Sequence, residues 1–251
     1  MPYANNRGVQ IRYEVEGAGP PLILQHGFTC SIDDWYEGGY VAVLKADHRL
    51  VLVDARGHGG SDKPRDSAAY TLEKRTGDVV AVLDALGLAK ADFWGYSMGG
   101  WIGFGMAQYA PERLDRLVIG GAHPYARDQG WFREQFRLAL SQGSDAFLTA
   151  WEQVVGGLAP GWRERLRTAD FGAYLAAAED RPDIAAVLPA MAMPCCVYAG
   201  EADSLCEPAR VASLEVPGAT FFSLPGLTHY QGFLRTDLVL PRVNAFLREP
   251  N

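Results

Sequence analysis

The segment Gly95-Tyr96-Ser97-Met98-Gly99 places a serine in a setting suited to nucleophilic chemistry. Residues 91–94 before it are mostly apolar and predict a buried strand, and the apolar residues 100–107 after it predict a helix. A direct turn from strand to helix strains the serine backbone and crowds the two elements together, so glycine is needed at positions 95 and 99. The strain holds the hydroxyl clear of the sheet, within reach of a base and a substrate. We therefore predict that Ser97 is a nucleophile.

A serine hydroxyl is a weak nucleophile at neutral pH, so it needs a base and a group that orients the base. The best candidate base is His229, which follows the last predicted strand, residues 219–224. Ligands and catalytic groups of open α/β sheets gather at the carboxyl ends of strands. The order nucleophile, acid, histidine along the chain also points to His229. The other histidines are His26, His48, His58 and His123.

Two positions compete for the acid that orients the histidine. Asp203 directly follows a predicted strand at 195–199, in a loop expected to lie beside that of His229. Asp128 is the alternative, because the acid could instead follow the strand at 114–119. Glu201 is a weaker substitute within the first loop. We favour Asp203.

The negative charge that develops on the substrate oxygen needs two backbone N–H donors. One should be the amide of Met98, which follows the nucleophile and begins a helix whose dipole favours negative charge. The other should come from the loop after the predicted strand at 21–24, where we choose Phe28. His26 and Gly27 shape that turn, and we expect His26 to bond to the backbone.

These side chains require strands that end at one edge of a sheet. Strands alternate with helical segments, which predicts an α/β fold with a mostly parallel sheet covered by helices on both faces. An alternating segment at 8–15 predicts an additional antiparallel strand with one wet face. The expected helices are a region at 32–45 interrupted near 38–39, a segment at 72–86 that Thr71 caps, and a final helix at 238–247 with Pro241 in its first turn.

Between residues 122 and 189 the alternation gives way to a helical stretch rich in aromatic residues. We expect a cap over the sheet there, with the core formed by residues 1–121 and 190–251. Most of these aromatic side chains must join the cap to the sheet domain, since a small helical insertion has little core of its own. At least one set, drawn from Trp131, Phe136, Phe147 and Trp151, should line a substrate pocket.

Composition narrows the range of partners. The 251-residue chain carries a net charge of −7 and no basic run, which argues against nucleic acid and anionic membranes. It has neither an apolar run of membrane-spanning length nor a signal-peptide pattern, so we expect a cytoplasmic protein. Its four cysteines show no C-x-x-C pair and suit a reduced compartment. We expect a small-molecule substrate and neither metal nor organic cofactor; the oligomeric state is not readable.

Taken together, these motifs resemble the signature set of the α/β-hydrolase superfamily over nearly the whole chain. They are His26-Gly27-Phe28, the segments 54–61 and 95–100, Gly200-Glu201-Ala202-Asp203, and Gly226-Leu227-Thr228-His229. The resemblance implies an eight-stranded sheet, a compact cap and a Ser97–His229–Asp203 triad. Two positions depart from the family pattern: Thr228 stands where glycine often precedes the histidine, and Pro208 lies later than the usual proline after the acid.

The resemblance also implies acyl transfer. Related dehalogenases and epoxide hydrolases attack with aspartate at the elbow, the turn between strand and helix that Ser97 occupies here, so Ser97 argues against both. We expect a carboxylesterase-like serine hydrolase for small to medium apolar or aryl esters, because an unpaired charge in an apolar pocket is costly. The alternatives are an enol-lactone hydrolase, a hydrolase of carbon–carbon bonds in aromatic degradation, a cofactor-free perhydrolase and a ligand-binding receptor on the same fold.

Overall fold

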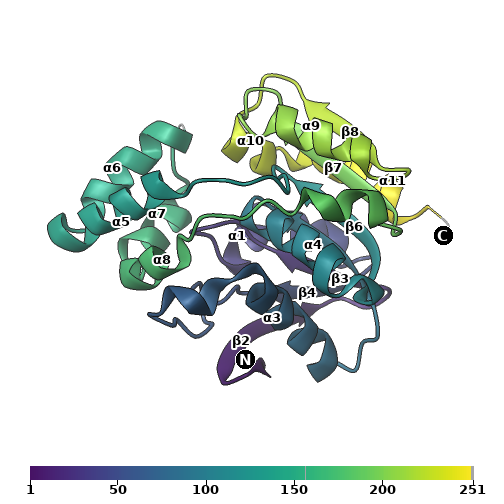
Figure 1. Ribbon diagram of the computed structural model, residues 1–251, viewed down its shortest axis with the longest axis horizontal. Coiled ribbons are helices and arrows are strands. Elements are labelled where there is room, and N and C mark those ends of the chain that lie inside the picture. The colour runs from purple at the N-terminus through teal and green to yellow at the C-terminus, as the bar shows by residue number, and fades with distance from the viewer. Residues whose placement is uncertain (156, 250–251) are drawn as a thin grey trace.

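The computed structural model describes residues 1–155 and 157–249. Its centre is an eight-stranded sheet in the order β1-β2-β4-β3-β5-β6-β7-β8 (Figure 1). The β1–β2 and β2–β4 pairs are antiparallel, and all other neighbours are parallel. The predicted mostly parallel eight-stranded sheet is confirmed. Its strands are β1 (Tyr3–Asn6), β2 (Val9–Glu16), β3 (Pro21–Gln25), β4 (Arg49–Val53), β5 (Ala91–Tyr96), β6 (Leu114–Gly120), β7 (Cys195–Gly200) and β8 (Thr220–Leu224).

Helices connect the strands. No helix in the described ranges is long and apolar enough to cross a membrane. Those nearest the sheet are α1 (Ile32–Glu37), α2 (Tyr40–Leu44), α3 (Leu72–Ala85), α4 (Met98–Tyr109), α9 (Cys206–Glu215), α10 (His229–Leu234) and α11 (Thr236–Leu247). Four more follow β6: α5 (Gly130–Gln142), α6 (Ser144–Val155), α7 (Pro160–Arg167) and α8 (Phe171–Ala177). Short 3₁₀ turns are η1 (Ser67–Tyr70), η2 (Pro111–Arg113) and η3 (Ala185–Ala190).

The continuous apolar strands are buried on both faces of the sheet, as parallel strands must be when helices cover them. In β4, Leu50 and Leu52 pack with α1, α2 and α11, whereas Val51 and Val53 point to the opposite side and pack with α3 and α4. Successive strand residues point to opposite faces, so one apolar run serves two cores.

The turn between β5 and α4 brings three pieces of backbone into contact. A Cβ on Gly99 would lie 2.0 Å from the carbonyl oxygen of Gln25, the last residue of β3. A Cβ on Gly95 would lie 2.1 Å from the carbonyl oxygen of Gly99. Both glycines are therefore required by close packing, in agreement with the role expected for them.

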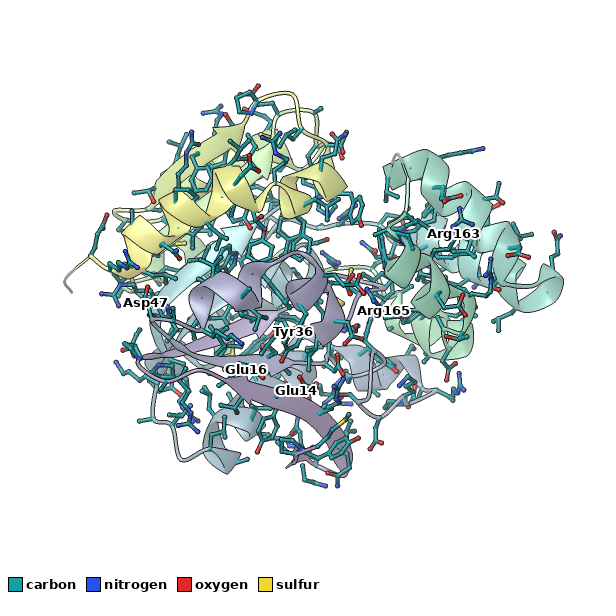
Figure 2. All side chains as sticks on the ribbon, turned by 180° about the vertical axis from the view of Figure 1, so that it is seen from behind. Glu14, Glu16, Tyr36, Asp47, Arg163 and Arg165 are labelled. Atoms are coloured by element: carbon teal, nitrogen blue, oxygen red, sulfur yellow. The ribbon has the colours of Figure 1, made fainter. Side chains whose placement is uncertain are left out.

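Helices α5 to α8, here called the helical insertion, gather at one end of the molecule (Figure 1). Its α7 is bonded to the core: Trp162 Nε1 donates to the carbonyl oxygen of Thr29 at 3.2 Å. Arg165 of the same helix pairs with Asp34 at 2.8 Å and with Glu37 at 2.5 Å, and it faces α1 (Figure 2). The turn η3, within the segment predicted as cap, packs against α4 and α9 instead. The division at residues 122 and 189 stays a prediction.

Three details differ from the expectations. Strand β1 was not predicted; it is a short edge strand that pairs only with β2. Residue 229 is the first residue of the unpredicted helix α10 rather than part of a loop. Helix α11 begins at Thr236, with Asp237 in its first turn, so Pro241 lies inside the helix and not in the first turn.

The contact at Gly99 gives a direct test of the turn. Gly99→Ala should lower the free energy of unfolding by about 2–3 kcal/mol, because the added methyl overlaps backbone that cannot move without shifting β3. Gly130→Ala is the control: its methyl meets only the exposed carboxylate of Asp128, so a change below about 1 kcal/mol is expected. Urea unfolding of both variants makes the comparison, and equal losses of stability would contradict the close-packing argument.

Candidate active site

Ser97 occupies the turn between β5 and α4 with a strained backbone. Its φ of 56° and ψ of −112° lie in a region that residues with a side chain rarely adopt. The Ser97 amide donates to the carbonyl oxygen of Gly120 at 2.8 Å, which ties the turn to the end of β6. Helix α4 begins at the next residue. The strain is therefore held by the neighbouring strand and directs the hydroxyl away from the sheet.

Three predicted side chains form one hydrogen-bonded line. His229 Nε2 lies 2.9 Å from Ser97 Oγ, and His229 Nδ1 lies 2.5 Å from Asp203 Oδ2. The other carboxylate oxygen of Asp203 accepts the amide N–H of Leu205 at 2.9 Å. With the ring proton on Nδ1, Asp203 accepts it and Nε2 is free to accept the serine proton. This is the arrangement that general-base activation of a serine requires.

The loops that carry Asp203 and His229 are packed against each other. They follow the parallel neighbours β7 and β8, and the amide of Ala202 donates to Leu227 O at 3.0 Å. A Cβ on Gly200 would lie 2.1 Å from that same oxygen, so the loops touch through their backbones. Thr228 and Gln231 form a capping box at the start of α10.

Two backbone amides flank Ser97. A Cβ on Gly27 would lie 3.4 Å from the Cβ of Ser97, so the loop after β3 lies directly against the serine. The carbonyl oxygen of Gly27 accepts hydrogen bonds from His26 Nδ1 at 2.7 Å and from Cys30 N at 3.3 Å. That carbonyl shares a peptide plane with the N–H of Phe28, so both bonds also orient this N–H. The amide of Met98 is the first of helix α4.

The alternative acids bond to other groups. Asp128 accepts the amide of Gly130 at 2.7 Å and pairs with Arg133 at 3.3 Å. Glu201 accepts the hydroxyl of Ser223 at 2.8 Å. The carboxylate against His229 is that of Asp203, which is 7% exposed.

Two other histidines near the elbow have structural partners. The amide of Ala55 donates to His26 Nε2 at 3.0 Å, in keeping with the expected backbone role. Burial lowers the pKa of both His26 and His58, which keeps their rings neutral. Burial and the nearby Arg127 and Arg181 lower the pKa of His123 to about 4.

A cavity of about 470 Å³ opens over Ser97 and His229, between the ends of the strands and the helical insertion. Trp131 and Trp151, two of the expected pocket residues, line it together with Phe132. Several other lining side chains were not predicted, because they come from separate segments that only the fold brings together. These are Trp162, Tyr230, Arg127 and Arg181.

Two predicted pocket residues do not reach this cavity. Phe136 and Phe147 are 0% exposed and lie 5.2 Å apart, ring to ring, inside the helical insertion. Phe136 also packs edge-on against Phe28 at 5.6 Å. Helical spacing placed them correctly on one face with the tryptophans, but α8 covers that part of the face with Phe171, which also packs against both rings. Their expected role as pocket walls is wrong: Phe136 joins the insertion to the core through Phe28, and Phe147 packs inside the insertion.

Within residues 1–155 and 157–249, no three His, Cys, Asp or Glu side chains gather in a way that could hold a metal ion. The groups that Ser97 has around it are its histidine and aspartate and two backbone amides. Together these groups can take a proton from an attacking hydroxyl and stabilise an oxyanion.

Comparison with known proteins yields a family match. The sequence profile of the family described as the alpha/beta hydrolase fold matches residues 20–179. A protein of Azorhizobium caulinodans that is provisionally named a carbamate hydrolase is 34% identical over 154 residues, 60% of this chain. A protein of Bacillus subtilis, provisionally named a 2-succinyl-6-hydroxy-2,4-cyclohexadiene-1-carboxylate synthase, is 32% identical over 57% of this chain. These alignments span 56% of each relative's own length.

Solved structures resemble the whole chain. The enol-lactonase of Burkholderia xenovorans LB400 has a TM-score of 0.85 at 26% identity, covering 99% of this chain and 100% of that one. An esterase of Rhodococcus sp. ECU1013 has a TM-score of 0.83 at 25% identity, covering 99% and 98%.

The geometry around His229 predicts which acid matters. Asp203→Asn should reduce kcat by about 10⁴-fold, because an amide in this place favours the wrong histidine tautomer. Asp128→Asn should change kcat by less than about 3-fold, since that carboxylate bonds to Arg133 and Gly130 instead. Thermal unfolding checks that both variants fold. The reverse order of kcat values would assign the acid to Asp128.

Proposed function

The chain belongs to the α/β hydrolase fold family, and from this premise we propose that it is a serine hydrolase that cleaves carboxylic esters, cyclic esters included, through an acyl-enzyme on Ser97. The observation that carries the proposal is the hydrogen-bonded line from Ser97 Oγ through His229 to Asp203, beneath a cavity large enough for a small substrate.

In the first half of the reaction, Ser97 Oγ attacks the ester carbonyl carbon while His229 Nε2 takes the serine proton. Asp203 keeps the ring oriented and stabilises the imidazolium that forms. The carbonyl electrons move onto oxygen, and the amides of Phe28 and Met98 donate hydrogen bonds to that oxyanion. When the electrons return, the carbon–oxygen bond to the alcohol breaks, and His229 gives the alcohol its proton.

In the second half, a water molecule replaces the alcohol. His229 takes a proton from the water as its oxygen attacks the acyl carbon, and the same two amides stabilise the second oxyanion. The bond from the acyl carbon to Ser97 Oγ then breaks, and His229 returns the proton to the serine. The carboxylic acid leaves and loses its proton to solvent.

A lactone is a cyclic ester, so the same steps open its ring. The resemblance of the whole chain to an enol-lactonase structure supports including lactones among the substrates. Several relatives are named epoxide hydrolases, and the match to one from Sus scrofa covers 43% of this chain. The family's epoxide hydrolases attack with aspartate at the elbow; the serine here supports an acyl-enzyme instead.

The proposal is tested by turnover and by labelling. The protein should hydrolyse a short p-nitrophenyl ester, and an organophosphonate should form one adduct, on Ser97, because that hydroxyl bonds to His229. Ser97→Ala should lose both ester hydrolysis and labelling, whereas Ser141→Ala on the surface of α5 should keep them.

Peptide mass spectrometry locates the adduct, and release of p-nitrophenolate measures turnover. An adduct on Ser204, the other serine of the cavity, would contradict the assignment. A folded protein that never turns over any ester would favour the ligand-binding alternative.

The aromatic wall of the cavity gives a second test. Trp131→Ala should lower kcat/KM for a p-nitrophenyl ester by about 3- to 10-fold, since it removes apolar surface that the bound aryl group would cover. Leu140→Ala removes an exposed apolar side chain from the same helix outside the cavity and should have no effect. Equal kinetics for wild type and Trp131→Ala would return this tryptophan to a purely structural role.

A further inference from the structure

Two arginines face each other on the chain segments that join the sheet to the helical insertion. Arg127 and Arg181 form an antiparallel bridge, with the amide of each donating to the carbonyl oxygen of the other at 2.9 and 2.8 Å. The segments run side by side between the two parts of the molecule (Figure 1). Residues directly opposite in such a bridge place their side chains on the same side. Both side chains line the cavity that holds Ser97 and His229.

The charges of these arginines are not balanced by ion pairs. In the ranges 1–155 and 157–249, neither guanidinium has a carboxylate within 4.0 Å. Asp203 is close enough to attract Arg127, but its carboxylate already accepts from His229 and Leu205. Arg127 and Arg75 both lie near enough to Arg181 to repel it. Burial and this repulsion lower the pKa of Arg181.

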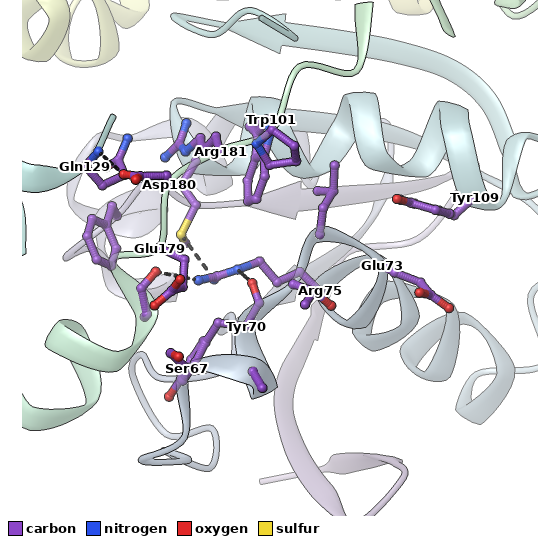
Figure 3. Close-up of a pocket in the computed structure, with 17 residues that line it drawn as sticks. Ser67, Tyr70, Glu73, Arg75, Trp101, Tyr109, Gln129, Glu179, Asp180 and Arg181 are labelled. Carbon is purple, nitrogen blue, oxygen red and sulfur yellow. Dashed lines mark hydrogen bonds between the residues drawn. The ribbon is translucent and has the colours of Figure 1, made fainter. Parts of the chain in front are cut away.

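The acidic residues on either side of Arg181 in sequence are engaged elsewhere. Asp180 pairs with Arg133 at 2.7 Å and accepts the amide of Gln129. Asp183 accepts the amide of Ala185 at 2.9 Å. The guanidinium of Arg181 instead lies over the ring of Trp101, 4.9 Å from its centre. Figure 3 shows it beside Trp101 and above Arg75, in a second cavity of about 510 Å³ that shares Arg181 with the first.

Half-buried like charges without a counter-charge are costly, and the cost is removed when an anion binds between them. Arginine is suited to a carboxylate, because its planar fork can donate two parallel hydrogen bonds. We propose that Arg181, with Arg127 beside it, binds a carboxylate group of the substrate, so that the enzyme prefers esters or lactones that carry a carboxylate away from the reacting carbonyl. This rests on the proposed serine hydrolase function. It replaces the expected preference for neutral esters, which considered only the aromatic wall.

Matched substrates separate this role from a structural one. The mono-p-nitrophenyl ester of adipate carries a terminal carboxylate where p-nitrophenyl hexanoate ends in a methyl group. Wild type should show a kcat/KM at least about 10-fold higher for the adipate ester. Arg181→Gln should lose about 10- to 100-fold on the adipate ester and stay within about 2-fold on the hexanoate. Arg181→Lys should recover part of the loss, since it restores charge without the fork.

Arg163→Gln on α7 is the control, because it removes a charge from the insertion outside the cavity and should change neither value. A preference for hexanoate in the wild type would overturn the carboxylate subsite while leaving the serine hydrolase proposal in place. Equal losses on both esters in Arg181→Gln would also overturn it, since they indicate a structural role. Failure of the wild type on every ester would instead overturn the proposed function.

Arg127 is attracted to Asp203, so it could act on Asp203 instead of binding the carboxylate of the substrate. The same pair of substrates distinguishes these two roles. A loss confined to the adipate ester in Arg127→Gln supports carboxylate binding. An equal loss on both esters, with the pH profile of kcat displaced, would show that Arg127 acts through Asp203, and it would remove Arg127 from the subsite.

Discussion

The structure depends on one steric constraint, the contact of three backbone segments at the turn between β5 and α4. The backbone at Gly99 touches the end of β3, and Gly95 touches the backbone at Gly99. Because both positions are glycine and carry no Cβ, α4 can approach the sheet closely enough to hold Ser97 in its unfavourable conformation. The same contact brings the loop after β3, with the amide of Phe28, against the serine. The position of Ser97 and that of the proposed oxyanion donors thus share one geometric cause.

The remaining groups depend on how parallel strands end. β7 and β8 are neighbours in register, so the loops that follow them meet above the sheet edge. Backbone contacts between these loops leave little freedom for Asp203 and His229, and Tyr96 of β5 adds a bond to the carbonyl oxygen of His229 at 2.5 Å. His229 is therefore anchored from its own loop and from the strand that leads to Ser97. Such support keeps the hydrogen-bonded line in place before substrate arrives.

The helical insertion gives the site its walls and its charge. Its aromatic residues divide into a buried group around Phe136 and Phe147 and a group around Trp131 and Trp151 that faces the cavity. The segments that attach it to the sheet place Arg127 and Arg181 at the cavity edge. A wall that is apolar on one side and cationic on another suits a substrate with an apolar body and an anionic end. In the proposed enzyme, the core therefore provides the serine chemistry, and the insertion with its attaching segments determines the choice of substrate.

The sequence by itself determined the strand-turn-helix unit at Ser97 and singled out His229 as the candidate base, because local steric rules and chain order are sufficient for both. It also determined the alternating strands and helices, since a strand that is buried on two faces is visible in the sequence as a continuous apolar run. Only the tertiary structure shows that His229 bonds to Asp203 and not to Asp128, as both follow predicted strands and the contact depends on which strand lies beside β8. Phe136 and Trp131 share a helix, and only the tertiary structure distinguishes their roles. Phe136 is covered by α8, whereas Trp131 faces the cavity. The pairing of Arg127 with Arg181 is of the same kind: it joins two segments on opposite sides of the insertion, and no local pattern encodes a contact between residues so far apart in the chain.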